Sequence, residues 1–385
     1  METSVQTPKI KTGTPGMLIV ARIARYLVGT IFIISGLIKL NDPVGTQIKL
    51  EEYFEVFAQD LPALHGFFEA LIPAALLISV VMCVLEVVLG VALLASYKPK
   101  LTTWILLALV SYFTILTFYS AYFNKVTDCG CFGDALKLKP WTSFTKDVVL
   151  MVLILFIIGH RNRMPSRKTG WIVGLATILS IGLGIYAIEF LPPLDLLPYA
   201  VGKNIPTLMK PSEELRYKYI MTKDGQEFEF DKYPTEGGYT FKEMVLLNEN
   251  AKQKITDYRV WNDADGDFTQ ETFKGNKLFV IIKNVKEFDA GSMPAIRSLL
   301  KGLQGSAVTP YILTSVSNDE ITAFMKEYQL EASVYQADAT VLKTIMRSNP
   351  GTWLLSNGTV KGKWHVNTTP TVEEILGAVG SGSKQ

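Results

Sequence analysis

LTTWILLALVSYFTILTFYSAYF, residues 101–123, decides the structural class of this protein. The stretch contains no charged side chain, and as a helix it is long enough to cross the roughly 30 Å hydrocarbon core of a bilayer. Residues 70–97 are equally apolar and carry one charge, Glu86. Further apolar runs occupy residues 26–38, 148–160 and 170–188. The sequence therefore predicts five membrane-spanning helices.

Composition supports a membrane protein with a soluble part. The chain has 385 residues, of which 48% are apolar and 19% charged, which excludes a single ordinary soluble domain. The net charge of +2 indicates no nucleic-acid partner. After the fifth run, FLPPLDLLPYAVGKNIP (residues 190–206) has prolines that end helical structure, so a soluble tail begins there.

Basic residues predict the orientation. They cluster before the first span, between the second and third, and between the fourth and fifth, which places these segments in the cytoplasm of a bacterium. The first span lacks a cleavage site and is expected to remain as an anchor in the inner membrane. The expected domains are a cytoplasmic tail (1–20), a four-span membrane domain (21–160), a fifth span with its cytoplasmic loop (161–190), a periplasmic linker or extension (191–262) and a periplasmic α/β domain (263–380).

The segment after the first span predicts an amphipathic helix. Leu50, Tyr53, Phe54 and Phe57 recur at helical spacing beside acidic residues. Such a helix is either a lid that packs on the bundle or a gate over a lipid-facing pocket. The sequence leaves both interpretations open.

TDCGCFGD, residues 127–134, holds two of the three cysteines, Cys129 and Cys131. A disulfide needs its Cα atoms within about 4.4–6.8 Å, and Gly130 permits the bend that this spacing requires. Strain in such a bond raises its reduction potential and makes it an oxidant of other thiols. Asp128 opposes thiolate formation and Lys125 favours it. Alternatively, the cysteines are small residues in a tight turn.

We expect no metal site, because zinc takes four ligands and the outer loops add only His65 to these two thiols. Glu86 is costly inside a membrane and needs a partner. The candidates are Lys39, a bound head group, or the hydroxyls of the third span (Tyr112, Thr114 and Thr117). Its role is either a packing hydrogen bond or proton transfer and quinone binding. Cys83 is expected to be a small apolar residue too deep to reach the CGC loop.

Three segments carry a family resemblance: RYLVGTIFIISGLIKLNDP (25–43), EVVLGVALL (86–94) and DCGCFGD (128–134). In this order and at these span positions, residues 20–160 resemble the DoxX and MauE families of bacterial membrane proteins. The resemblance implies a four-helix core linked to redox chemistry, either disulfide formation in methylamine utilisation or quinone-linked thiol oxidation. It assigns Cys129 and Cys131 as redox thiols. The remaining site residues that it implies are Asp128, Gly130, Phe132 and Gly133 in the loop and Glu86 with Lys39 in the membrane.

The tail alternates strands and helices from Gly275 onward, with a capping box at Ser317 to Glu320 that begins one helix. It resembles a thioredoxin-like fold in which Pro350 is the cis-proline, TWLL (352–355) an edge strand and SNGT (356–359) a hairpin turn. Upstream, we expect short strands around Asp224-Gly225 and a helix near 240–252. DADGD (263–267) is expected to be a solvated turn rather than a calcium loop.

The tail departs from active thioredoxins at the decisive position. Their thiol motif falls where this chain has KEFD, residues 286–289, and the tail contains no cysteine. It therefore cannot exchange thiols itself, and binding a periplasmic or membrane protein partner is the remaining expectation.

Two main hypotheses follow. The first is an inner-membrane protein that supports thiol and disulfide redox of exported proteins, with quinone as the candidate cofactor. The second is a non-catalytic scaffold that presents its redox-dead thioredoxin-like domain to a partner. A third, transport through Glu86, also remains. Whether the chain is an enzyme, a thiol-disulfide or quinone oxidoreductase, stays open at this point.

Overall fold

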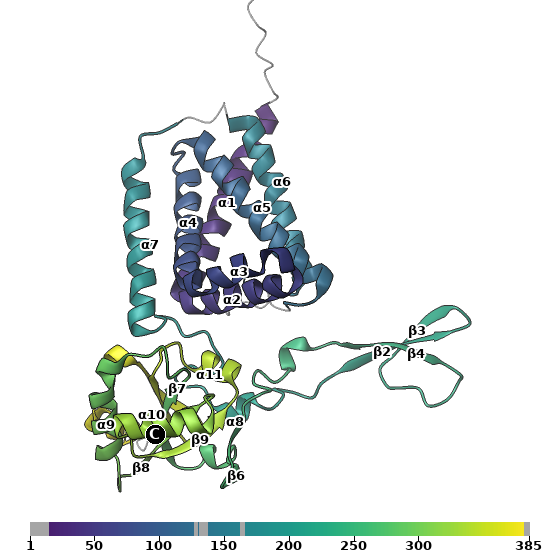
Figure 1. Cartoon of the computed structure of the whole chain (residues 1–385). Coiled ribbons are helices and arrows are strands. Elements are labelled where there is room, and N and C mark those ends of the chain that lie inside the picture. The colour runs from purple at the N-terminus through teal and green to yellow at the C-terminus, as the bar shows by residue number, and fades with distance from the viewer. Residues whose placement is uncertain (1–14, 127–129, 131–137, 162–165, 381–385) are drawn as a thin grey trace, which may run out of the picture. The chain divides into compact units, whose positions relative to one another are not determined.

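The computed structural model describes residues 15–126, 130, 138–161 and 166–380. They divide into two compact units, residues 1–194 and 195–385, each with its own core. The first is helical and the second contains all the described strands (Figure 1).

Five helical segments of the first unit are long and apolar enough to cross a membrane, as the sequence predicted. They contain α1 (Pro15–Asn41), α4 (Ala75–Leu94), α5 (Pro99–Phe123), α6 (Pro140–His160) and α7 (Gly170–Phe190). The segment that includes α4 begins at Pro62. Helices α5 and α6 each begin with a proline, which is favoured at this position because its fixed φ suits a helix and its nitrogen needs no partner.

The bundle core lies between α1, α4, α5 and α6, and α7 runs beside them (Figure 1). Val28, Leu106 and Ile154 are fully buried there. Helices α1 and α4 approach closely through three glycines. A Cβ atom on Gly90 would lie 2.7 Å from the Gly29 carbonyl oxygen, and one on Gly36 would lie 3.0 Å from the Cys83 carbonyl oxygen. Small residues allow this backbone contact, as is common between membrane helices.

The predicted amphipathic helix is α2 (Pro43–Asp60), which lies with α3 (His65–Leu71) across the ends of the bundle helices (Figure 1). Asp42 caps α2 by accepting a hydrogen bond from the Gly45 amide. Leu50 and Phe54 pack against Ala75 at the start of α4. Two 3-10 turns, η1 (Pro62–Leu64) and η2 (Ile72–Ala74), flank α3.

The second unit contains a seven-stranded sheet in the order β11-β10-β7-β8-β9-β5-β6. Its strands are β5 (Val260–Asn262), β6 (Gly266–Asp267), β7 (Asn276–Ile282), β8 (Val308–Thr314), β9 (Ser333–Ala337), β10 (Gly351–Ser356) and β11 (Thr359–His365). Its helices are α8 (Ile205–Leu208), α9 (Met293–Gly302), α10 (Asn318–Tyr328), α11 (Ala339–Ile345) and α12 (Val372–Gly380). Short 3-10 turns are η4 (Glu249–Ala251), η5 (Glu271–Phe273), η6 (Ala290–Ser292) and η7 (Val366–Thr368).

The arrangement of β11, β10, β7 and β8 is thioredoxin-like. Strand β7 is parallel to β8 and antiparallel to β10, which forms a hairpin with β11. The Asn349-Pro350 peptide bond is cis, as predicted, and Ser317 caps α10 by accepting from the Glu320 amide. The DADGD segment forms the turn of the β5–β6 hairpin.

Two predictions for the tail are wrong. TWLL is not an edge strand, because β10 pairs on both sides and Trp353 is fully buried. Residues 240–252 are not a helix. Instead, β4 (Thr240–Leu246) pairs with β2 (Tyr217–Lys223), which also pairs with β3 (Gln226–Phe230). The apolar residues of β4 align with those of β2 across the sheet, so cross-strand pairing outweighs the helical preference of its charged residues.

Candidate functional site

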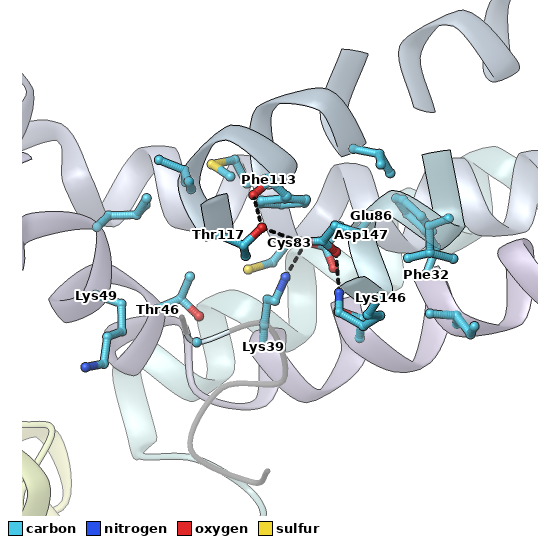
Figure 2. Close-up of a pocket in the computed structure, with 18 of the residues that line it drawn as sticks. Phe32, Lys39, Thr46, Lys49, Cys83, Glu86, Phe113, Thr117, Lys146 and Asp147 are labelled. Carbon is cyan, nitrogen blue, oxygen red and sulfur yellow. Dashed lines mark hydrogen bonds and ion pairs between the residues drawn. The ribbon is translucent and has the colours of Figure 1, made fainter. Parts of the chain in front are cut away.

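A cavity of about 60 Å³ lies inside the helical unit, between α1, α2, α4, α5 and α6 (Figure 2). By this measure it has room for several water molecules, since each needs roughly 10–15 Å³. Polar and apolar side chains share its wall. The polar or thiol-bearing residues that line it are Ser35, Lys39, Thr46, Lys49, Tyr53, Cys83, Glu86, Thr117, Lys146 and Asp147.

An ion pair forms one wall of the cavity. The Lys39 Nζ at the end of α1 donates to Glu86 Oε1 in α4 at 2.5 Å, and both side chains are almost fully buried. The ammonium also lies 4.7 Å from the centre of the Phe113 ring. Of the candidate partners for Glu86, the structure selects Lys39. Pairing is what allows two charges to stay out of water at this depth.

A second carboxylate, Asp147 on α6, lines the same cavity. It accepts a hydrogen bond from Thr117 at 3.1 Å and pairs with Lys146 at 2.5 Å (Figure 2). Asp147 is 2% exposed. Asp147 is not among the residues predicted from the sequence, although it is, like Glu86, an acid beside an apolar helical run. The cavity wall therefore has two carboxylate–ammonium pairs, one buried on both sides and one whose lysine is partly exposed.

Gly130, the central residue of the CGC motif, also lines this cavity. Its φ of +62° lies in the left-handed region, which agrees with the bend expected at this glycine. A Cβ atom there would lie 3.2 Å from Cγ of Lys49 on α2. The other predicted loop residues, Asp128, Cys129, Cys131, Phe132 and Gly133, lie outside the described residues.

Cys83 lies on the wall of the same cavity and is fully buried. From the start of the apolar run at residue 70, Cys83 is expected to lie too deep to reach the CGC loop. In the structure α4 begins only at Ala75, so Cys83 lies about 12 Å along the helix. The preceding residues belong to the segment that crosses the bundle end. Cys83 and Gly130 consequently border one space.

Lys125, expected to favour thiolate formation, has another partner. Its ammonium pairs with Asp60 at the end of α2, and Asp60 also accepts a hydrogen bond from Tyr119. The bonds from Lys125 and Tyr119 hold the pKa of the Asp60 carboxyl below its usual range. Asp60 thus largely compensates the positive charge of Lys125, which weakens the effect that this charge would have on a thiol.

Pro350 belongs to the other unit and takes no part in this cavity. Beside it, the Asn349 carboxamide donates to the Asn284 and Glu287 carbonyl oxygens and accepts from the Lys283 amide. These bonds hold residues 283–287, which overlap the KEFD segment at 286–289.

The helical unit is similar to a known family of membrane proteins. Residues 17–159 match the family model described as methylamine utilisation protein MauE. This region is a MauE-type membrane domain. The chain therefore combines a MauE-type multi-pass membrane domain with a domain whose strand arrangement is thioredoxin-like, and the MauE resemblance found in the sequence is confirmed.

One curated relative of the MauE-type fusion is "Protein TlpB" from Flavobacterium psychrophilum, which is 25% identical over 169 residues. The match covers 41% of this chain and 42% of the relative, so the chain spans less than half of that protein. A solved structure, titled as a DsbF homologue from Corynebacterium diphtheriae, matches 39% of this chain and 98% of its own length. Its sequence identity is 12% and its TM-score 0.26.

Proposed function

We propose that this MauE-type protein supports thiol and disulfide redox of exported proteins, with Cys129 and Cys131 as the reacting pair. The supporting observation is the position of Gly130, which joins these cysteines and lines a cavity with two ion pairs and two buried carboxylates. The polar groups of this cavity could pass protons during a redox reaction of the neighbouring cysteines. Its five apolar helices make the protein a multi-pass membrane protein. The bacterial inner membrane and the periplasmic face of the CGC loop are part of the proposal.

The proposed step is thiol–disulfide exchange. A client thiolate attacks the Cys129–Cys131 disulfide, and a second client thiol resolves the mixed disulfide, so that the client is oxidised and the CGC pair becomes a dithiol. Two electrons and two protons pass to the CGC pair. Quinone is the acceptor that we propose for its reoxidation: it takes up the two electrons and two protons and becomes quinol. With this cycle the protein is a membrane thiol–quinone oxidoreductase. Such an activity would supply the disulfide bonds of an exported enzyme in methylamine utilisation.

A second candidate function is a non-catalytic scaffold. The observation that favours it is the thioredoxin-like domain, which has no cysteine in residues 195–385. Asn349 hydrogen-bonds to Asn284 and Glu287, close to where an active thioredoxin would carry its thiols. In this case the domain binds a protein partner, and the membrane domain anchors it.

Replacement of Cys129 and Cys131 by serine, singly and together, tests the first function. We expect each single variant to lose most of the oxidising activity, because one sulfur cannot form the disulfide. The readout is the redox state of exported thiol proteins, measured by alkylation and gel shift in cells. The Ser212→Ala variant is the control, since Ser212 lies in the other unit and does not line the cavity.

Deletion of residues 195–385 separates the two functions. If exported thiols keep their redox state in the cysteine variants while the deletion impairs growth, the redox proposal is wrong and the scaffold is supported. If the double variant loses thiol oxidation and the deletion retains it, the scaffold function is excluded as the main role.

A further inference from the structure

A groove lies between α1 and α6, beside the cavity of Figure 2. Its volume is about 510 Å³. Its walls are Leu27 and Ile31 of α1 and, on α6, Trp141, Thr142, Thr145, Lys146, Val149 and Leu150. Leu27, Trp141 and Val149 are about half exposed on the surface of membrane-spanning helices. In a membrane this surface faces lipid, so the groove is open to the hydrocarbon.

The groove and the cavity have a common wall. Ile31, Lys146 and Leu150 line both. Lys146 places its ammonium 2.5 Å from Asp147 in the cavity, while its side chain also borders the groove. A long lysine side chain can cover apolar surface with its stem and keep its charge in a polar place. The side chain of Lys146 therefore links the lipid-facing groove with the polar groups of the cavity.

Polarity changes along this path. The outer groove offers Leu27, Trp141 and Val149, which suit an apolar chain, whereas the inner cavity offers ammonium and hydroxyl donors. Every lysine that lines the cavity already has a carboxylate partner: Lys39 with Glu86, Lys49 with Glu52 and Lys146 with Asp147. An anionic head would bury a further charge with no cation left to balance it. An uncharged head with hydrogen-bond acceptors fits better.

We propose that the α1–α6 groove is a lateral entrance through which a lipid-soluble molecule with an uncharged, carbonyl-bearing head reaches the cavity from the bilayer. Its chain lies along Leu27, Trp141 and Val149, and its carbonyl oxygens accept hydrogen bonds from Lys146 and the cavity hydroxyls. This inference deepens the proposed function, because a quinone that reoxidises the CGC pair would enter by this path.

Photolabelling of the full chain in lipid nanodiscs tests the entrance. The probe is an azidoquinone with a decyl chain, and mass spectrometry locates the label. We expect label on α1 and α6 near the groove, reduced by excess decylubiquinone but not by decyl phosphate, whose head is anionic. Equal competition by decyl phosphate, or label spread evenly over the lipid-facing helices, would overturn the proposal.

A matched pair of variants sharpens the test. Val149→Trp fills the groove, whereas Val152→Trp makes the same exchange on the lipid-facing side of α6, outside the groove lining. We expect at least a fivefold loss of groove label in the first and no change in the second. If Val149→Trp does not elute as a folded protein, Leu27→Trp and its control Ile23→Trp answer the same question on α1. Unchanged label in the groove variants contradicts the entrance.

The test of the lateral entrance can be separated from the test of thiol oxidation by Cys129 and Cys131. Labelling is repeated in the Cys129→Ser/Cys131→Ser variant, which retains the groove and cavity walls. Groove labelling in this variant supports the entrance even if exported thiols prove independent of the cysteines. Absence of groove labelling, with cysteine-dependent thiol oxidation intact, overturns the entrance alone.

Discussion

Lys39 and Glu86 form the most completely buried ion pair of the cavity, with side-chain exposures of 7% and 3%. The attraction between them largely compensates for the cost of removing both charges from water. Removal of one partner is strongly destabilising, because the other charge then stays buried without compensation. The pair should therefore behave as a unit when it is mutated.

We expect Lys39→Met to reduce stability by about 3–5 kcal/mol, because Glu86 is left unpaired, and the Lys39→Met/Glu86→Met double variant to recover much of that loss. Thermal unfolding of the detergent-solubilised chain measures both. Lys49→Met is the control: its pair with Glu52 is partly exposed, so the loss should stay below about 1 kcal/mol. Equal losses in Lys39→Met and Lys49→Met would refute this account.

At the scale of elements, the contact between α1 and α4 depends on the absence of side chains. Gly29, Gly36 and Gly90 bring the two backbones together, and the same approach places Lys39 opposite Glu86. Membrane helices gain little from hydrophobic burial against each other, so close van der Waals packing carries much of their association. A side chain at Gly90 must push the helices apart.

Gly90→Val should accordingly lower the unfolding temperature and cost about 1–3 kcal/mol, the usual range for overpacking. Gly159→Val on α6 serves as the control, because no atom lies within 4 Å of a Cβ atom built there. Both exchanges alter helix propensity equally, so the difference between them reports the contact. A similar effect of the two substitutions would show that the α1–α4 approach contributes nothing specific.

Elements with a strong local signal could be predicted from the sequence. The five spans follow from long apolar runs, α2 from its spaced aromatic residues and the α10 start from Ser317. Residues 240–246 were mistaken for a helix because their strand character depends on pairing with β2, which is distant in sequence. Asp147 shows a different failure: its signal was present at the edge of an apolar run, but the adjacent Lys146 made the position look like a membrane boundary.

For the whole molecule, basic residues predict which loops share one side of the membrane. Lys100, at the start of α5, should face the cytoplasm, while Ser212 in the tail should face outward. Contacts between distant segments could not be predicted in the same way. The common cavity of Cys83 and Gly130 depends on how α2 crosses the bundle end, which no local pattern specifies.

Orientation can be tested with Lys100→Cys and Ser212→Cys, each in a background whose native cysteines are replaced by serine. A membrane-impermeant maleimide applied to spheroplasts should label Ser212→Cys at once. Lys100→Cys should react only after the membrane is permeabilised. The reverse pattern would place the CGC loop in the cytoplasm, where disulfides are rare.

The Lys39–Glu86 pair has a consequence for biosynthesis. The two residues are 47 positions apart, so at about 5–20 residues per second Lys39 leaves the ribosome about 2–9 s before Glu86. During that interval the lysine has no acid from α4. Its place near the end of α1 lets the side chain reach the head-group region and wait there with its charge hydrated. The arrival of α4 then draws the ammonium inward, so assembly of the cavity is coupled to insertion of the second span.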